Sequence, residues 1–86
     1  MVVYIKGFRF VRSPFRPVHA EFRYFDGFSF VRGSVSGPAG DLACWTGLIL
    51  DYVLSKVDPE QLRWMVDVSL RLNPGQFRDA VKLERR

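Results

Sequence analysis

The side chains best suited to binding chemistry in this sequence are arginines and aromatic rings, and both are concentrated in residues 1–36. That part holds six basic residues against two acidic ones, and nine of the thirteen aromatic residues. Arginine forks onto phosphate or carboxylate and stacks on rings, so this mixture is typical of nucleic-acid sites and of protein-interface hot spots. The candidate interaction or nucleic-acid-binding residues are Arg9, Arg12, Arg16, Arg23, Phe25, Phe28, Phe30 and Arg32.

Residue types that carry catalysis or bind metals are scarce. The only histidine, His19, lies near a proline in an expected strand. The only cysteine, Cys44, lies in an apolar stretch, where cysteine usually acts as an inert small hydrophobic residue. No pair of carboxylates has a spacing that indicates acid and base roles, and Asp51 and Asp67 fit the polar edges of helices. We therefore expect no enzyme activity, no metal site and no cofactor.

One short segment is similar to a known motif. Lys6-Gly7-Phe8-Arg9-Phe10-Val11 resembles the start of the RNP1 motif of RNA recognition motif domains, whose strand-borne rings stack on bases. The resemblance covers one strand: Arg9 replaces the small residue of the motif, Ser13 stands where an aromatic residue is expected, and the βαββαβ order of that family is missing. We assign no family, although Phe8 and Phe10 beside arginines have the chemistry to stack and to neutralise phosphate in any sheet.

The first part of the chain predicts three antiparallel strands. Residues 2–12 are rich in β-branched and aromatic residues, and the two prolines in 13–17 interrupt this run. Asp26-Gly27, between two aromatic-rich runs, favours a two-residue type I′ hairpin turn. That turn would pair Phe25 with Phe28, Tyr24 with Ser29, Arg23 with Phe30, Phe22 with Val31 and Glu21 with Arg32. One face would then carry Val18, Ala20, Phe22, Tyr24, Val31 and Val35 toward a helix, and the other His19, Glu21, Arg23, Phe25, Phe28, Phe30 and Arg32.

The rest of the chain predicts helices that cover this sheet. Residues 41–57 are almost wholly apolar and contain an i, i+3, i+4 stripe that must face a core. The stripe consists of Leu42, Trp45, Leu48, Ile49, Tyr52 and Val53. Asp58-Pro59 begins a second helix to about Leu72, on which Trp64, Val68 and Leu72 form a second apolar line, and Asn73-Pro74 repeats the start signal for a short third helix. Residues 83–86 are expected to fray.

Together these elements predict an α+β fold: a three-stranded antiparallel sheet (βββ) packed on two to three C-terminal helices. The chain is read as a single domain over 1–86, with a sheet part at 1–36 and a helical part at 41–86. The glycine-rich residues 33–40 resemble a phosphate loop only weakly, because no Lys-Ser/Thr pair follows, and fit better as a connector whose Asp41 caps the helix.

Composition narrows the class of function. The formal charge is +4, the hydrophobic content is 48%, and the single cysteine excludes an internal disulfide framework. We expect a small cytoplasmic domain that is not bound to membrane. It would act as a protein–protein assembly or accessory subunit through its aromatic and arginine sheet face, as a homo-oligomer or with a protein partner. The alternative is a module that binds RNA or single-stranded DNA through the same face, and some of these rings would in either case complete the core.

Overall fold

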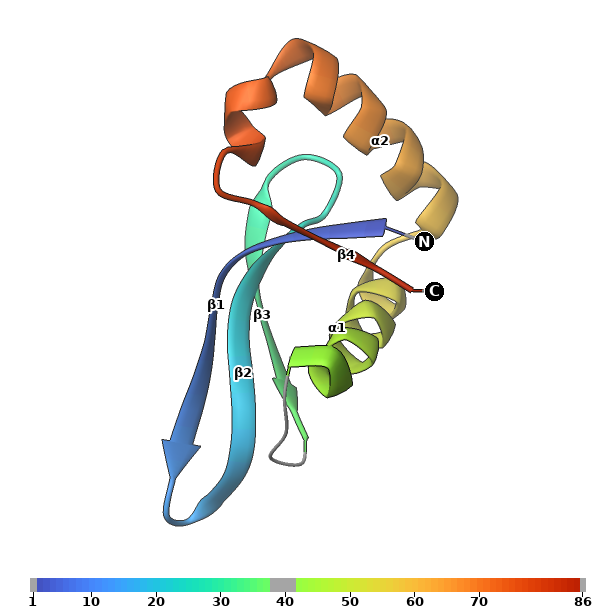
Figure 1. Cartoon of the computed structure of the whole chain (residues 1–86). Coiled ribbons are helices and arrows are strands. Elements are labelled where there is room, and N and C mark those ends of the chain that lie inside the picture. Colours follow the sequence, from blue (N-terminus) through green and yellow to red (C-terminus); the bar gives the residue numbers. More distant parts are fainter. Residues whose placement is uncertain (1, 38–41, 86) are drawn as a thin grey trace.

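The computed structural model describes residues 2–37 and 42–85, apart from the side chains of Arg16 and Leu42. It has an α+β fold with a four-stranded antiparallel sheet in the order β3-β2-β1-β4 (Figure 1). The elements are β1 (Val2–Ser13), β2 (Arg16–Phe25), β3 (Phe30–Ser36), α1 (Leu42–Lys56), α2 (Pro59–Leu72), the 3-10 turn η1 (Pro74–Phe77) and β4 (Val81–Glu84). The α+β class and the antiparallel pairing of the first three strands are therefore confirmed.

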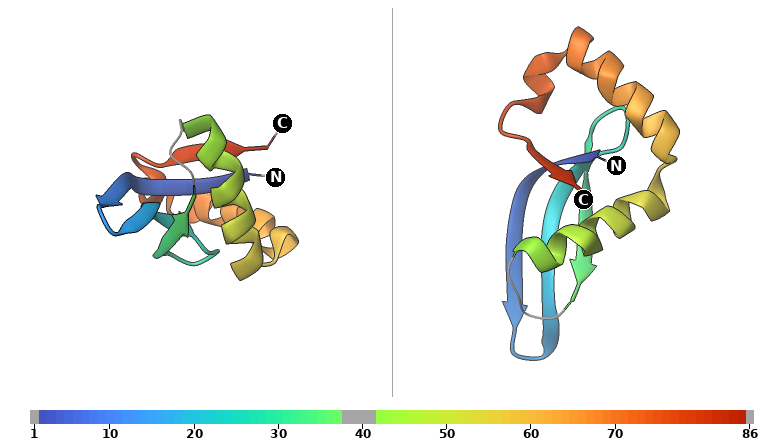
Figure 2. Two further views of the ribbon diagram at one scale, coloured as in Figure 1. Left: turned by 90° about the horizontal axis from the view of Figure 1, so that it is seen from below. Right: turned by 45° about the vertical axis from the view of Figure 1, so that its right-hand side comes forward.

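Helix α1 crosses one face of the sheet, and α2 with η1 arches over one end of it (Figure 2). The main core lies between α1 and that face, and its members are 0 to 6% exposed: Val3, Ile5, Ala20, Phe22, Tyr24, Trp45, Ile49, Leu50 and Val53. Leu50 lies outside the predicted stripe yet is buried, since β4 also lies against α1 and Arg85 reaches Asp51 and the Gly47 carbonyl. Strand β4 of the same sheet thus covers Leu50, whereas Ala43 and Cys44, which also lie outside the stripe, stay exposed. The predicted cap, Asp41, lies outside the described residues.

A β-bulge in β1 explains why its sequence alternates imperfectly. Ile5 lies opposite Tyr24 and Lys6 opposite Arg23, but two residues of β1 lie between Lys6 and Arg9 where only one, Phe22, lies between their partners on β2. Gly7 in the bulge has a φ of 61°, which glycine adopts without steric penalty. The extra residue moves Phe8 and Phe10 to the α1 face, where Phe10 meets the Trp45 ring edge-on at 5.3 Å between centroids.

The β2–β3 turn is longer than the Asp26-Gly27 pair predicts. Residues 26–29 form a four-residue loop, in which the Asp26 carboxylate accepts hydrogen bonds from the Phe28 and Ser29 amides at 2.8 and 3.0 Å. Phe25 therefore pairs with Phe30 rather than with Phe28. The predicted register was wrong by two residues, because the sequence does not reveal that the aspartate side chain stabilises the wider loop. Since two residues is one full strand period, the side chains within β2 and β3 keep their predicted faces, but Phe28 moves from the strand into the loop.

The C-terminal part departs most from the prediction. Asp58 caps α2 as expected, accepting from the Glu60 and Gln61 amides at 2.9 and 3.2 Å. Of the two to three predicted helices, two α-helices form, and the short third one is reduced to the 3-10 turn η1; Asp79, at a φ of 65°, lies between η1 and β4. Strand β4 pairs with β1, placing Leu83 opposite Val3, so residues 83–85 do not fray but complete the sheet. Four residues of weak alternation give too little signal to distinguish a strand from a chain end.

Candidate functional site

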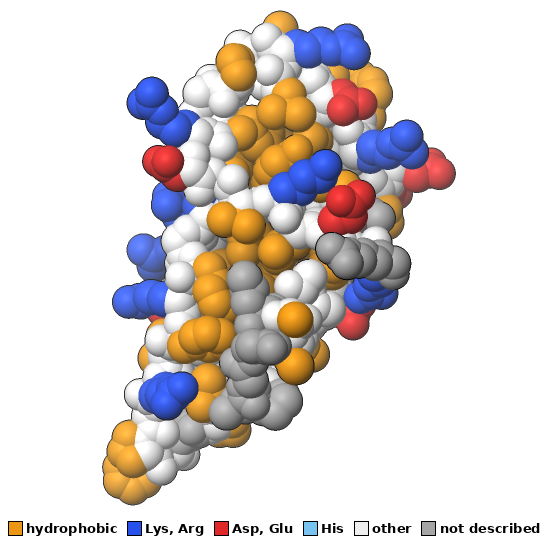
Figure 3. Space-filling model, viewed as in Figure 1, with side chains coloured by type: hydrophobic (Ala, Val, Ile, Leu, Met, Phe, Trp, Pro, Cys, Tyr) orange, Lys and Arg blue, Asp and Glu red, His pale blue; other side chains and the backbone are white. Residues whose placement is uncertain are grey.

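The sheet face turned away from α1 carries most of the candidate residues. Side chains of β1, β2 and β3 form rows across this face, set by the pairings Lys6 with Arg23 with Arg32, and Arg9 with Glu21 with Ser34. We call Lys6, Arg23 and Arg32 the cationic row. Lys and Arg side chains project along the margin of the molecule on the β1 side (Figure 3). Three strands thus present three positive charges side by side.

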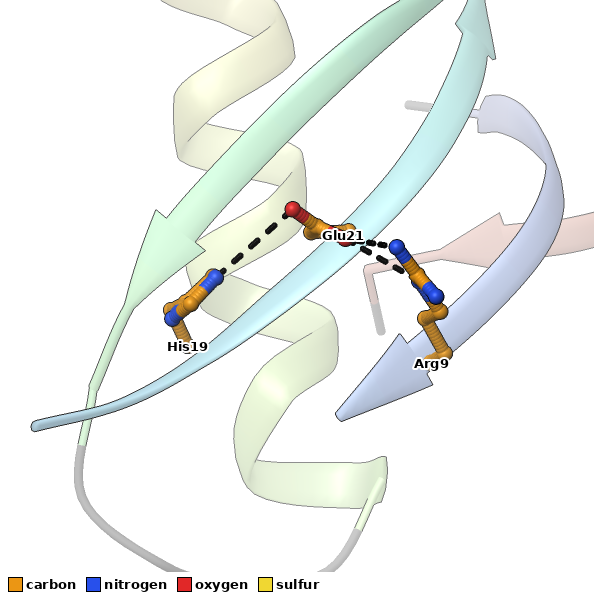
Figure 4. Close-up of polar contacts among 3 residues, drawn as sticks. All are labelled: Arg9, His19 and Glu21. Atoms are coloured by element: carbon orange, nitrogen blue, oxygen red, sulfur yellow. Dashed lines mark hydrogen bonds and ion pairs between the residues drawn. The ribbon is translucent and has the colours of Figure 1, made fainter. Parts of the chain in front are cut away.

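The second row contains an ion-paired network. Arg9 donates from Nε to the Glu21 carboxylate at 3.0 Å, and His19 Nε2 lies 3.7 Å from the other Glu21 oxygen (Figure 4). The hydrogen bond from Arg9 and the positive charges of Arg9 and His19 hold the pKa of Glu21 below its ordinary value of 4.5, against a smaller opposing effect of desolvation. Glu21 was predicted to pair with Arg32; in the true register it pairs with Arg9 instead.

The cationic row has no comparable counter-charge. Arg23 and Arg32 are exposed and lie directly opposite each other, and their side chains make no hydrogen bond or ion pair to any residue that the structure describes. Lys6 is half-buried: its Nζ donates to the Gln76 carbonyl and lies 4.3 Å from the centre of the Phe30 ring. The predicted contact of Phe30 with Arg23 is therefore replaced by one with Lys6.

The aromatic residues of this face are mostly covered. Phe25 is fully buried and Phe30 is half-buried, in a cluster with Tyr4 and Phe77 whose neighbouring rings have centroids 4.9 to 5.7 Å apart. Phe77 comes from η1, which closes over this end of the sheet. Phe28, in the turn, is 71% exposed. Of the three predicted stacking rings, Phe28 alone is open to a ligand.

The remaining candidates lie toward the other end of the sheet. Arg12 is exposed on β1, two residues beyond Phe10, near the β1–β2 hairpin turn. The backbone of Arg16 begins β2, but its side chain is outside the described part of the chain. The structure therefore groups Arg9, Arg23 and Arg32 around one hollow and leaves Arg12 apart from it.

An exposed apolar line on α2 was not among the predicted site residues, although the sequence shows its i, i+4, i+8 spacing. Trp64 is 63% and Leu72 80% exposed, and Val68 lies between them. The buried residues of the helix, Leu62 and Val66, point the other way. Beside them, a hollow between α2 and the sheet has Val2, Tyr4, Val66 and Leu70 on its apolar side. We call Trp64, Val68 and Leu72 the α2 ridge.

The described residues contain no metal centre. No three His, Cys, Asp or Glu side chains in residues 2–37 and 42–85 are placed to share a metal ion. Cys44 is exposed on α1 rather than buried in it. In the same ranges, no helix has the length and apolar character needed to span a bilayer. No protein-family model, curated protein or solved structure matches this chain, so its function has to be inferred from this geometry.

Proposed function

We propose that the protein is a small, non-enzymatic assembly module, and that its contact surface is the α2 ridge rather than the rings of the sheet. The observation that carries the proposal is the exposure of Trp64 and Leu72 on one line of one helix. Tryptophan is enriched among the residues that dominate binding energy at protein interfaces. Two large apolar side chains aligned on a helix surface are suited to a partner, and the aromatic rings of the sheet are already used in the core.

The partner that best fits this ridge is a second copy of the chain. Trp64 and Leu72 each lie four residues from Val68, on opposite sides of it, so an antiparallel pairing of two α2 helices about Val68 sets each Trp64 against the other copy's Leu72. Asp67 and Arg71 are exposed on one flank of the ridge. In this dimer Arg71 of one copy would lie within one helical turn of Asp67 of the other, where the two charges attract. The surface is self-complementary in both shape and charge.

The size of the ridge limits the strength of this contact. A tryptophan buries about 150–250 Å², so two copies of the ridge fall short of the roughly 1,200 Å² at the lower bound of standard interfaces. We expect a weak, concentration-dependent dimer whose association depends little on salt. A cytoplasmic location is part of the proposal, since one cysteine fits a reducing compartment.

Sedimentation equilibrium over a wide concentration range tests the proposal. Wild-type protein should shift from monomer to dimer as concentration rises, whereas Leu72→Asp should stay monomeric with an unchanged urea midpoint, because the side chain it replaces is exposed. Phe15→Ala is the matched control: Phe15 is 92% exposed at the β1–β2 turn, far along the chain from the ridge. A wild-type monomer at every concentration, or equal loss of dimer in the Phe15 variant, would refute the assignment.

A further inference from the structure

The cationic row poses an electrostatic problem that the fold alone does not solve. Arg23 and Arg32 are a directly opposed cross-strand pair, and like charges in that position are destabilising. The described residues supply neither of them with a carboxylate. Glu21, which lines the same hollow as Arg23 and Arg32, is engaged by Arg9 and His19. An anion from outside the chain would relieve this repulsion.

One member of the row, Lys6, is held in place. Lys6 is fixed by the Gln76 carbonyl and the Phe30 ring. Arg23 lies across the bulge, with Nε 3.7 Å from the point where a Cβ on Gly7 would sit. Arg9, Arg23, Arg32 and the exposed Ser34 line one hollow on this surface. The guanidinium forks of Arg23 and Arg32 are therefore free to share a tetrahedral oxyanion beside an ammonium group that is already positioned.

One residue connects the row to the exposed ring in the turn. Gln76 accepts from Lys6 through its carbonyl and donates from its side-chain amide to the Phe28 carbonyl at 3.2 Å. The 26–29 loop, with Phe28 at its tip, is thereby tied to the end of the cationic row. Phe28 itself borders a hollow with Lys56 and Asp58 at the junction of α1 and α2, so a ligand that reaches both the row and this ring has to run along the turn. A flexible single strand of nucleic acid can do so, because its phosphates contact cations and its bases stack on exposed rings without sequence preference.

We infer that the open part of this sheet face is a binding site for a single strand of nucleic acid, with a backbone phosphate between Arg23 and Arg32 and a base on Phe28. Phosphate is favoured over the carboxylates of an acidic protein segment for two reasons. The guanidinium groups of Arg23 and Arg32 can share its several oxygens, and a nucleic-acid strand also brings a base that can stack on Phe28. The inference does not depend on the α2 ridge, which lies on a different element.

The test is a fluorescence titration of labelled mixed-sequence single-stranded DNA and RNA at two or more salt concentrations. Wild-type protein should bind, with log affinity falling as log salt rises. Each of Arg23→Ala and Arg32→Ala should weaken binding and reduce that slope by about 0.7, the value for one phosphate contact on a single strand. Phe28→Ala should lower affinity about 5- to 150-fold, the equivalent of losing one stacked base.

Two variants sharpen the result. Glu21→Gln removes the only carboxylate of the two rows and releases Arg9, so it should raise affinity and steepen the salt dependence. Arg63→Ala removes the same charge as Arg23→Ala but from the exposed surface of α2, and should leave the salt slope unchanged. Leu72→Asp changes the α2 ridge and not this sheet face. It should bind nucleic acid nearly as wild type does, with only a small loss of affinity from the added negative charge.

Several outcomes would overturn the inference. Absence of binding at low salt would exclude a nucleic-acid site. An equal loss from Arg63→Ala would show attraction to net charge rather than a site. Competition by polyglutamate at the same charge concentration would show that the row recognises carboxylates. Full competition by inorganic phosphate or a mononucleotide at the same phosphate concentration would assign the site to a small phosphate ligand instead of a strand.

Discussion

Truncating Leu83 is the sharpest test of the fold, because it asks whether the last strand is part of the core. Leu83 lies on β4 opposite Val3 and is 5% exposed. Leu83→Ala removes three carbons from this position. At about 0.8 kcal/mol per buried methylene, the lost burial costs about 2.4 kcal/mol of unfolding free energy. A residual cavity would add to this cost, but neighbouring residues can relax into it because β4 is an edge strand. We expect unfolding free energy to fall by about 2 to 3 kcal/mol.

Urea unfolding followed by far-UV circular dichroism measures this change. A fall in midpoint at constant m would show lost stability rather than an altered unfolded state. For a domain of this size, the same loss lowers the melting temperature by roughly 10–20 °C. Val81→Ala, on the same strand but at a side chain that is 51% exposed, should cost less than about 1 kcal/mol.

The difference in stability between Leu83→Ala and Val81→Ala tests whether β4 is part of the core. If residues 83–86 frayed, as the sequence alone suggests, Leu83→Ala would change stability by no more than about 0.5 kcal/mol, the usual range for surface sites. Equal and small effects would therefore refute the placement of β4 against β1.

Three further predictions follow from other contacts. A Cβ added at Gly33 would lie 2.8 Å from a ring carbon of Tyr52, so Gly33→Ala should destabilise by about 1–3 kcal/mol, seen as a lower urea midpoint. Asp58→Ala removes the α2 cap and should cost about 1 kcal/mol in the same assay, with no change if the cap is unimportant. Because Arg9 lowers the folded-state pKa of Glu21, the stability difference between wild type and Glu21→Gln should be present at neutral pH and vanish as pH falls below 4.5; a pH-independent difference would contradict the pairing.

Local chemistry made part of this fold predictable. The hairpin at Asp26-Gly27, the start of α2 at Asp58-Pro59 and the buried stripe of α1 depend on residues close together in the chain, and the sequence indicates each of them. The width of the turn was missed because turn residues do not encode whether an aspartate side chain closes a longer loop. Strand β4 was missed because its partner, β1, lies at the opposite end of the chain.

The candidate site was likewise predictable where it depends on local sequence, and not where it depends on distant contacts. Charge bias identified the arginines of the sheet, and the shift of two residues left them on the predicted face. Phe25 and Phe30 were expected on an open surface, but η1 brings Phe77 onto them from about 50 residues away. Periodicity within a strand specifies which residues share a face. It does not specify what a distant segment later places on that face.

The pairing of β1 with β4 has a kinetic consequence. Strands β1, β2 and β3 are joined by short turns and can associate as soon as they emerge during synthesis, but Val3 meets Leu83 only after nearly all of the described chain has been made. Contacts this distant in sequence carry a large loop-closure entropy and tend to form late. The partly made chain therefore exposes one side of β1 as an unpaired edge, the kind of surface at which chains associate wrongly. Arrival of the final strand is then the event that both completes the core and removes the hazard.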